Sequence, residues 1–256
     1  MNMPYDAIAR YYDLSHQWLV DDIPFLLQQA AETGGPALEL GCGSGRLLAP
    51  LARAGTAVTG VDNSPEMLAR AAMRLAGEAA GVRARVHLVE SDVRSLTRPP
   101  GEPFALAYFG YNTFLHLDET AAAAALRRLR PLLRPGARLI IDVDHPLGLS
   151  AAGDDPDFVL EDELRDDALG ETVRQHTAYE SVPGEQAVDV TWVYETGRGD
   201  AEGRTQVTMR YHYLYPHQYD LLFGLTGFRL LGFLGDYDGS AFDEDSERLI
   251  VVGQAE

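Results

Sequence analysis

The segment 39–45 has the residue types and spacing of a ligand-binding turn. Its glycines, Gly41, Gly43 and Gly45, allow positive φ angles and let a ligand approach the backbone closely. The turn opens a predicted helix, whose first N–H groups would face that ligand. A dinucleotide fingerprint would place a glycine at position 46, where this chain has Arg46. The turn therefore predicts a ligand held at a helix N-terminus, without the spacing typical of NAD.

Two acids follow the turn at the ends of predicted strands. Asp62 closes the apolar run that comes next in the chain. A carboxylate there can accept both hydrogens of a ribose diol through charge-assisted bonds. Asp92 ends the third strand region, where it could accept a hydrogen bond from an adenine amino group. The turn and the two acids together predict a site for an adenosine-containing ligand.

Strands and helices alternate around these residues. We expect strands at 37–40, 57–61, 85–89, 104–109 and 138–143. We expect helices within 5–30, over 46–54, from a start at Ser64-Pro65-Glu66, and from Asp118 to about Leu133, followed by a turn at Pro135-Gly136. This alternation indicates βαβ units and a mainly parallel sheet, whose ligands bind at the carboxyl ends of the strands.

The pattern changes in the second half of the chain. Residues 154–167 are acidic and contain Pro156, which favours a solvated loop or a short helix. Over 172–215 the apolar period shifts toward two, which predicts an antiparallel sheet of three or four strands. The 216–225 segment is typical of a helix, and 228–235 and 248–252 would add strands to the main sheet.

The expected organisation has four parts. They are a helical cap (1–36), a Rossmann-like core (37–150), an inserted antiparallel lid or dimer subdomain (151–215) and the remainder of the core (216–256). The fold class is therefore α/β, a Rossmann-like and mainly parallel sheet with a small inserted antiparallel β-sheet subdomain.

Composition excludes several classes of function. The net charge of −18 and the lack of a dense basic cluster argue against nucleic acid and anionic membranes as partners. The chain has no lysine, so no Schiff-base or P-loop lysine is available. The single cysteine, Cys42, cannot form an intramolecular disulfide or a cysteine-rich zinc site. With no apolar run of roughly 18 residues and no signal peptide after Met1, we expect a cytoplasmic protein.

Residues 37 to about 143 resemble the class I S-adenosylmethionine-dependent methyltransferases. Glu39-x-Gly41-x-Gly43-x-Gly45 matches their first motif, Gly60-Val61-Asp62-x-Ser64-x-x-Met67-Leu68 matches their second-strand signature, and Asp92 matches their adenine-side acid. The resemblance implies S-adenosyl-L-methionine as cofactor. The cofactor-binding residues that we expect are Tyr12, Glu39, Gly41, Cys42, Gly43, Gly45, Asp62, Asn63, Met67, Asp92, Val93 and Phe109.

The resemblance also implies roles for these residues. The glycine turn would lie against the methionine part of the cofactor, Asp62 would hold the ribose, and Met67 would flank the adenine. Asp92 with Val93 would hold the polar edge of the adenine. Tyr5 or Tyr12 could hydrogen-bond the methionine carboxylate, for which Arg10 and Arg46 are the available cations.

The methyl acceptor must approach from the segments after strands four and five. There His116 and His145 are candidate bases. The chain lacks the Asn-Pro-Pro-Tyr tetrad of nucleic-acid and protein amide N-methyltransferases, which argues against those substrates. Asp142, Asp144 and Asp236 could converge, but nothing in their spacing requires a metal, and none is predicted.

We therefore expect methyl transfer to nitrogen or oxygen of a small molecule. Aromatic residues and acids in the insertion suit a small, cationic acceptor. The place of the insertion resembles that of sugar amine N-methyltransferases of antibiotic pathways, where such a sheet helps enclose substrate or form a dimer, so a homodimer is a further expectation. Two alternatives stay open at this point: an aminopropyltransferase that uses a decarboxylated cofactor, and a non-catalytic regulatory protein that binds the cofactor.

Overall fold

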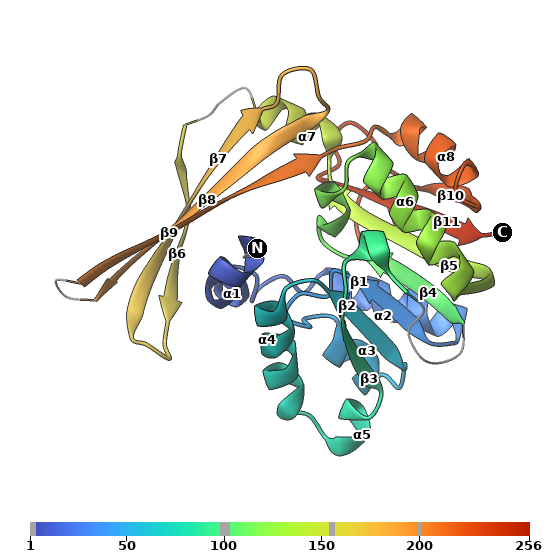
Figure 1. The fold of residues 1–256 in the computed structure, drawn as a ribbon, viewed down its shortest axis with the longest axis horizontal. Helices are drawn as coiled ribbons and strands as arrows, with labels where there is room; N and C mark the ends of the chain where they lie inside the picture. Colours follow the sequence, from blue (N-terminus) through green and yellow to red (C-terminus); the bar gives the residue numbers. More distant parts are fainter. Residues whose placement is uncertain (1–3, 98–102, 154–156, 199–200) are drawn as a thin grey trace.

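The computed structural model describes residues 4–97, 103–153, 157–198 and 201–256 of the chain. It contains a seven-stranded sheet in the order β10-β11-β5-β4-β1-β2-β3 and a separate four-stranded sheet in the order β6-β7-β8-β9 (Figure 1). The strands are β1 (Ala37–Leu40), β2 (Val58–Asp62), β3 (Val86–Glu90), β4 (Phe104–Phe109), β5 (Leu133–Asp144), β6 (Val159–Asp166), β7 (Glu171–Ser181), β8 (Ala187–Arg198), β9 (Ala201–His212), β10 (Phe228–Leu234) and β11 (Arg248–Ala255). The helices are α1 (Pro4–Ser15), α2 (Asp22–Thr33), α3 (Leu48–Arg53), α4 (Pro65–Ala76), α5 (Ala80–Arg83), α6 (Glu119–Leu129), α7 (Pro146–Ala152) and α8 (Pro216–Gly224), with short 3-10 turns η1 (Val93–Ser95), η2 (Thr113–His116) and η3 (Arg130–Leu132).

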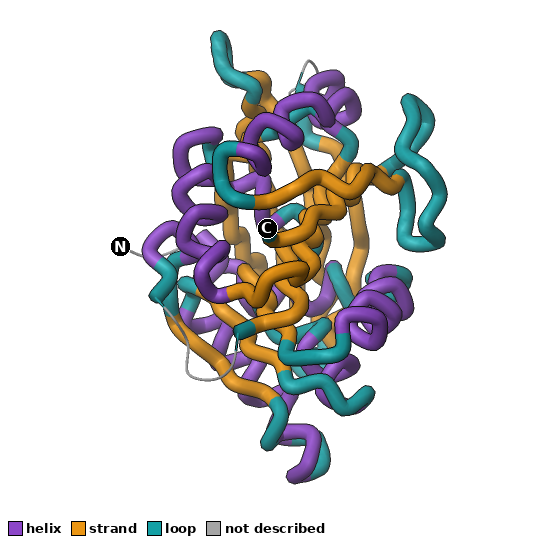
Figure 2. Tube along the Cα trace, turned by 90° about the vertical axis from the view of Figure 1, so that its right-hand side faces the viewer, coloured by secondary structure: helices purple, strands orange, loops and turns teal. Residues whose placement is uncertain are grey.

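The larger sheet is parallel from β3 to β5 and antiparallel at its other edge. β1 pairs in parallel with β2 and β4, while β11 pairs antiparallel with both β5 and β10. Helices cover both faces of the sheet (Figure 2). The strand order reverses between β1 and β4, which is where open α/β sheets bind ligands. The predicted fold class is confirmed.

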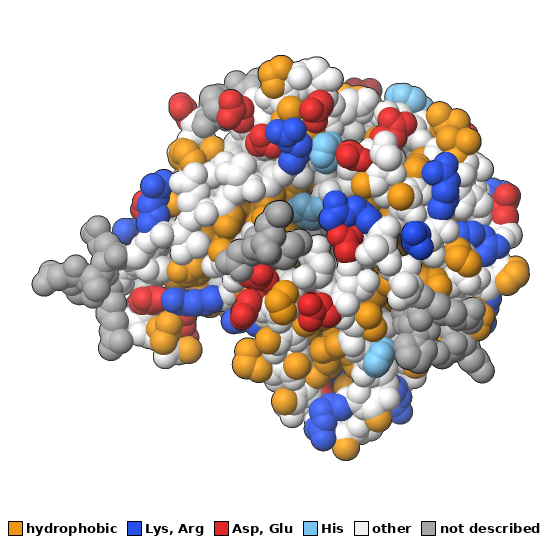
Figure 3. Space-filling view, viewed as in Figure 1, with side chains coloured by type: hydrophobic (Ala, Val, Ile, Leu, Met, Phe, Trp, Pro, Cys, Tyr) orange, Lys and Arg blue, Asp and Glu red, His pale blue; other side chains and the backbone are white. Residues whose placement is uncertain are grey.

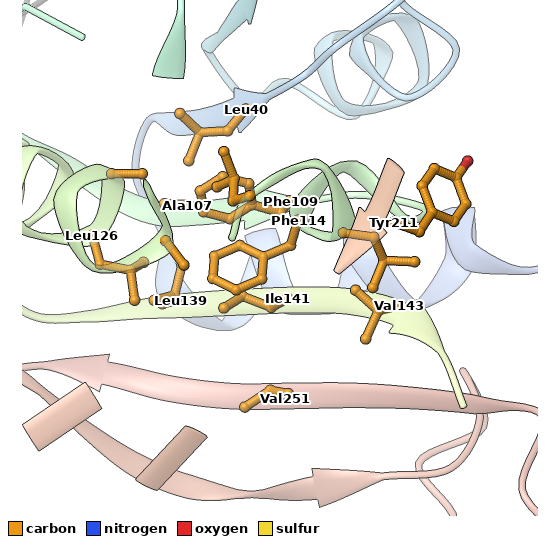
Figure 4. Close-up of a cluster of buried hydrophobic side chains, with 14 of the residues drawn as sticks. Leu40, Ala107, Phe109, Phe114, Leu126, Leu139, Ile141, Val143, Tyr211 and Val251 are labelled. Carbon is orange, nitrogen blue, oxygen red and sulfur yellow. The ribbon is translucent and has the colours of Figure 1, made fainter. Parts of the chain in front are cut away.

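Strand β4 shows how the sequence fills both faces of the sheet. Ala107 and Phe109 belong to one buried cluster, whereas Leu106 and Tyr108 belong to another, because successive side chains of a strand point to opposite faces. Phe109 lies against Phe114 with ring centroids 5.0 Å apart (Figure 4). A strand buried on both faces reads as a continuous apolar run, as the prediction for 104–109 assumed.

Local signals determine where several helices begin. The Ser64 Oγ accepts the backbone N–H of Met67 at 3.1 Å, and Pro65 occupies the first helical position of α4. The Asp118 carboxylate caps α6 by accepting the N–H of Ala121 at 2.7 Å. Both helix starts were predicted from these capping residues.

The four-stranded sheet is inserted in the chain between β5 and β10 of the main sheet, as predicted. The expectation of a loop or short helix at 154–167 is wrong for its described part, because Val159–Asp166 forms the edge strand β6. Only Leu164 and Asp166 of β6 are buried, so this strand has no apolar alternation, and its pairing with β7 determines its conformation. Pro156 lies outside the described residues.

Two smaller expectations also change. Residues 135–136, expected as a turn before strand five, lie within β5 as the structure defines it. Helix α7 was not predicted; His145 caps it by accepting the N–H of Leu147 on Nδ1 at 3.1 Å. The glycines between 197 and 203 also predict a turn, but that segment includes residues outside the described part.

Helix α1 lies between the two sheets (Figure 1). Its Tyr11 ring stacks on Tyr194 of β8, with centroids 4.6 Å apart. Its Asp13 pairs with Arg70 at 2.7 Å and with Arg74 at 3.0 Å, both on α4. The cap therefore joins the inserted sheet to the main body.

Two surface properties bear on the expected partners. Acidic and basic side chains are interspersed over the face in Figure 3. Among the described residues, the helices are too short or too polar to cross a bilayer.

Candidate functional site

A cavity of about 240 Å³ opens where the strand order reverses. We call it the first cavity. Of the residues expected at the site, it is lined by Tyr12, Gly41, Gly43, Asp62, Asn63, Met67, Asp92, Val93 and His116. Its lining also contains Pro4, Tyr5, Ser91, Arg94, Tyr111, Thr113, Leu117 and Met209. The structure thus brings the turn after β1, the ends of β2 and β3, and α1 to one place.

The glycine turn leaves space that a larger residue would fill. Gly41 and Gly43 have φ angles of +73° and +51°, which L side chains rarely adopt. A Cβ at Gly41 would lie 2.3 Å from Cγ2 of Thr113, and a Cβ at Gly43 would lie 3.1 Å from Cε of Met67. Gly41 therefore excludes a side chain by both its backbone and its space, whereas at Gly43 the backbone disfavours one and the Met67 methyl would have to move.

The Asp62 carboxylate holds the turn and also faces the cavity. Its Oδ2 accepts the N–H of Gly43 at 2.7 Å, and its Oδ1 accepts the N–H of Ser64 at 2.9 Å. Burial raises the pKa of Asp62, and these backbone hydrogen bonds oppose the rise. An ionised carboxylate has about four acceptor positions, so ligand hydroxyls could take those that the backbone N–H groups of Gly43, Ser64 and Asn63 leave free.

Asp92 also lines the first cavity and contacts Arg94. The Arg94 Nε donates to both carboxylate oxygens, at 2.9 and 3.0 Å, and its backbone N–H donates to Oδ1 at 2.8 Å. These contacts lower the pKa of Asp92. Arg94 lies two residues after Asp92 in the chain but was not among the expected site residues.

Glu39 and Cys42 lie behind the turn and are absent from the lining of the first cavity. Glu39 is 3% exposed and accepts the hydroxyl of Tyr108 at 2.9 Å. Burial raises the pKa of Glu39 to about 8, so it is mostly protonated at neutral pH. Cys42 packs against Gly60, where a Cβ would lie 2.8 Å from its Sγ. Glu39 and Cys42 therefore pack beneath the glycine turn and do not face the first cavity.

Gly45 and Phe109 also lie away from the cavity lining. Gly45 has a φ of +75° and lets α4 approach, since a Cβ there would lie 3.0 Å from Cβ of Ala71. Phe109 is completely buried, because the alternation of β4 directs it into the core cluster on one face of the sheet, beside Phe114 (Figure 4). A direct cofactor contact from Phe109 does not fit this position.

The two candidate bases lie in different places. His116 lines the first cavity, and its Nε2 is 2.9 Å from the hydroxyl of Tyr5. Burial lowers the pKa of His116 to about 4, so the imidazole is neutral at pH 7. His145 is outside that lining; it caps α7 and stacks on Phe242, with centroids 4.8 Å apart. The structure therefore brings only His116 to the site.

Both arginines considered for the methionine carboxylate have other partners. Arg46 donates from Nη1 and Nη2 to the Asp22 carboxylate at 2.7 and 2.5 Å. Arg10 donates to Asp166 at 3.0 Å and also contacts Glu171. The hydroxyls of Tyr5 and Tyr12 remain as candidate donors in the first cavity.

The turn after β4 adopts positive φ angles at two non-glycine residues, Tyr111 (36°) and Asn112 (66°). The Tyr111 N–H donates to the carboxylate of Asp142 at 3.1 Å, and Asn112 exchanges two hydrogen bonds with Asp144, each 2.8 Å long. Such backbone strain persists where surrounding contacts hold it, and it clusters at functional sites.

Asp142 and Asp144 bind an arginine in this structure. Arg248 Nε donates to Asp142 at 2.6 Å and Nη1 donates to Asp144 at 2.7 Å, while its guanidinium lies 4.8 Å from the Tyr111 ring centroid. No group of three or more metal-ligating side chains occurs within the described ranges. These acids therefore position the turn after β4.

A second cavity, of about 250 Å³, adjoins the first, because Tyr5, Tyr12 and Tyr111 line both. Its remaining lining consists of Ser15, His16, Leu19, Asn112, Asp144, Glu161, Asp162, Gln175, Tyr179, Trp192 and Tyr211. The sequence analysis did not single out the residues that β6 and β7 contribute here. The inserted sheet therefore forms one wall of the second cavity.

The charged side chains in the described lining of the second cavity are carboxylates. They are Asp144, Glu161 and Asp162, and no arginine accompanies them there. Burial lowers the pKa of His16 to about 4, so its ring is neutral at pH 7. The second cavity thus suits a polar or cationic molecule with an apolar body.

Part of the chain is similar in sequence to known methyltransferases. Residues 37–136 match a family model described as a methyltransferase domain. An uncharacterized methyltransferase of Geobacillus kaustophilus is 28% identical over 137 residues, which are 53% of this chain and 60% of that protein. The chain thus aligns with less than two thirds of that relative's length.

Solved structures resemble the whole chain. The CcbJ methyltransferase from Streptomyces caelestis is 25% identical with a TM-score of 0.83, over 99% of this chain and 98% of that one. The sugar N-methyltransferase KedS8 from a Streptoalloteichus species is 17% identical with a TM-score of 0.71, over 91% of this chain and 85% of that one. The similarity to the first of these includes the inserted sheet.

Proposed function

Because the chain belongs to the class I S-adenosylmethionine-dependent methyltransferases, we propose that it methylates an amine nitrogen of a small molecule. The cofactor of these enzymes is S-adenosyl-L-methionine, whose sulfonium carries an activated methyl group. The acceptor nitrogen, the small-molecule class and the residue roles below are our proposal.

The residues of the first cavity fit this cofactor. Gly41 and Gly43 form a cradle that a Cβ would fill. The Asp62 carboxylate keeps acceptor positions for the ribose hydroxyls, and Met67 is buried beside Gly43, where it would flank the adenine. Asp92 lines the same cavity, where the adenine amino group would compete with Arg94 for the carboxylate oxygens.

The observation that carries the proposal is the junction of the two cavities at Tyr5, Tyr12 and Tyr111. An acceptor held in the second cavity would reach the first one between these rings. Carboxylates and aromatic faces in the second cavity favour a molecule that carries basic nitrogen over a phosphorylated or acidic molecule. KedS8, whose name describes a sugar N-methyltransferase, shares the overall fold and supports this class of acceptor.

An amine attacks a sulfonium only with its lone pair free, so the acceptor must bind as the neutral base or lose a proton in the site. His116, which is hydrogen-bonded to Tyr5 in the first cavity, is a group that could accept this proton. Since the low pKa of His116 makes it a weak proton acceptor, positioning contributes more than base catalysis. The tyrosine rings exclude water from the path.

The test is methyl transfer from S-adenosyl-L-methionine to paired amines and alcohols of the same carbon skeleton. We expect S-adenosylhomocysteine to form with the amines, together with an N-methyl product seen by mass spectrometry. Products from the alcohols alone would contradict the choice of nitrogen. No S-adenosyl-L-methionine binding by the folded protein would contradict the whole proposal.

A further inference from the structure

The inserted sheet presents two neighbouring carboxylates to the second cavity. In a regular strand, successive side chains point to opposite faces. The pairing of β6 with β7 shifts between Leu160 and Asp162, so Glu161 is the extra residue of a β-bulge. Glu161 and Asp162 consequently both line the second cavity. Bulges re-aim side chains in this way beside active sites.

Contacts from β7 fix Glu161 on one side only. Gln175 Nε2 donates to Oε2 of Glu161 at 3.1 Å, and the Thr177 hydroxyl donates to the same oxygen. The other oxygen of Glu161, and both oxygens of Asp162, have no hydrogen bond or ion pair with the described part of the chain. Two carboxylates thus keep acceptor positions beside the cavity.

Gln175 provides an independent sign of a missing donor. Its side chain lines the second cavity and is 4% exposed, yet Oε1 finds no hydrogen-bond partner among the described residues. The amide is turned with its nitrogen toward Glu161, because a carboxylate can only accept hydrogen bonds. A buried acceptor without a partner is unfavourable, so this wall is built for a group that donates hydrogen bonds.

These carboxylates do not suit the nitrogen that reacts. A carboxylate stabilises an ammonium and raises its pKa, whereas the reacting nitrogen must be unprotonated. Glu161 and Asp162 line the second cavity and not the first, whereas Tyr5, Tyr12 and Tyr111 line both. The reacting nitrogen belongs at those tyrosines, and the carboxylates belong to another part of the acceptor.

We propose that Glu161, Asp162 and Gln175 form a subsite for a second cationic group of the acceptor, such as a protonated amine that is not methylated. The acceptor is then a molecule with two basic nitrogens. The subsite rests on the proposed function, since it assigns the second cavity to the acceptor. It acts in recognition, through charge-assisted hydrogen bonds and not through chemistry.

The experiment measures binding of three probes by calorimetry in the presence of S-adenosylhomocysteine. Cadaverine carries two amines, while aminopentanol and pentylamine keep one amine and replace the other with a hydroxyl or hydrogen. We expect cadaverine to bind at least about tenfold more tightly than aminopentanol, the size of a charge-assisted hydrogen bond. The variant Glu161→Gln, which keeps the acceptor for Gln175 and Thr177, should remove most of this preference, and adding Asp162→Asn should remove the rest.

Glu163→Gln is the matched control. Glu163 lies on the same strand but pairs with Arg174 at 2.8 Å on an exposed surface, so this variant should keep the preference. Cadaverine binding no tighter than aminopentanol, or a preference that survives the double variant, would overturn the subsite. A methylation assay on the same probes separates the two ideas: tight binding of cadaverine through Glu161 without any methyl transfer would leave the subsite standing and remove the proposed function.

Discussion

The Asp62 carboxylate accepts the backbone N–H of Gly43 at 2.7 Å, which ties the end of β2 to the glycine turn after β1. The same carboxylate accepts the N–H of Ser64, the residue that caps α4. It also lines the first cavity. One side chain therefore holds the shape of the proposed cofactor site and, in our proposal, also binds the cofactor.

The first prediction concerns Asp62→Ala. Removing the carboxylate would take away the proposed ribose contacts and the support of Gly43, so S-adenosyl-L-methionine affinity should fall by about 1.5–3 kcal/mol. Calorimetric titration of the purified variant measures this change. The control is Glu66→Gln, at the exposed start of α4, which should bind S-adenosyl-L-methionine like the wild type. Unchanged affinity in a folded Asp62→Ala protein would show that the ribose assignment is wrong.

The second prediction separates backbone strain from lost space at Gly43. Gly43→Ala places a Cβ on a backbone with φ +51°, at a cost of about 1–2 kcal/mol, and this Cβ also meets Met67 in the first cavity. Gly34→Ala carries a similar strain at φ +57°, but its Cβ meets nothing within 4 Å. Both variants should lower Tm, and only Gly43→Ala should lose cofactor binding. Equal cofactor affinity in the two variants would contradict the cradle.

The sequence could predict the parts of the fold that local chemistry determines. Ser64 and Pro65 specify a helix start through local contacts, independently of tertiary structure. The apolar run of β4 requires burial on both faces. The order of turn, strand and acid then places Gly43 and Asp62 at one sheet edge, because parallel strands align their carboxyl ends.

The remaining features depend on tertiary contacts. Residues 159–166 form a strand only because β7 pairs with them, and their polar composition gave no such signal. Phe109 and Tyr108 look equally suited to a site in the sequence, yet strand alternation directs them to opposite faces of the sheet. The second cavity requires α1 and the inserted sheet to meet, which no spacing in the chain reports.

The third prediction concerns pH and His116. Burial holds the pKa of His116 near 4 in the folded protein, below the usual 6.5. Between pH 6.5 and pH 4, His116 is therefore protonated in the unfolded chain but neutral in the folded protein. Stability is therefore lost as pH falls from 6.5 toward 4. His116→Gln should reduce the drop in unfolding free energy between pH 7 and pH 5 by about 2 kcal/mol.

Urea unfolding at the two pH values measures this difference. The control is His87→Gln, which removes an exposed imidazole on β3 and should leave the drop unchanged. His16 shares the lowered pKa, so part of the drop should remain in His116→Gln. An identical drop in wild type and His116→Gln would mean that His116 is readily protonated in the folded protein.

The last prediction concerns the buried cluster around Arg248. This side chain is 12% exposed and bonds to Asp142 and Asp144, which are 7% and 34% exposed. Arg248→Met leaves two acids without their cation, and breaking such a buried pair costs about 3–5 kcal/mol. Arg248→Lys should rescue only part of this loss, because one ammonium cannot reproduce the two-pronged contact. By contrast, Arg53→Ala removes an ion pair whose arginine is 59% exposed, and should cost no more than about 1 kcal/mol.

Urea unfolding at pH 7 ranks these variants, and acid then tests the cause. Burial raises the pKa of Asp144, so this acid takes up a proton more readily than usual once Arg248 is absent. The loss of unfolding free energy in Arg248→Met should therefore shrink as pH falls toward 4. The small loss in Arg53→Ala should stay nearly constant over the same range. Because the same acids hold Tyr111 and Asn112 at positive φ, Arg248→Met should also weaken acceptor binding. A stable Arg248→Met protein at pH 7 would show that the acids, and not their arginine, maintain the turn after β4.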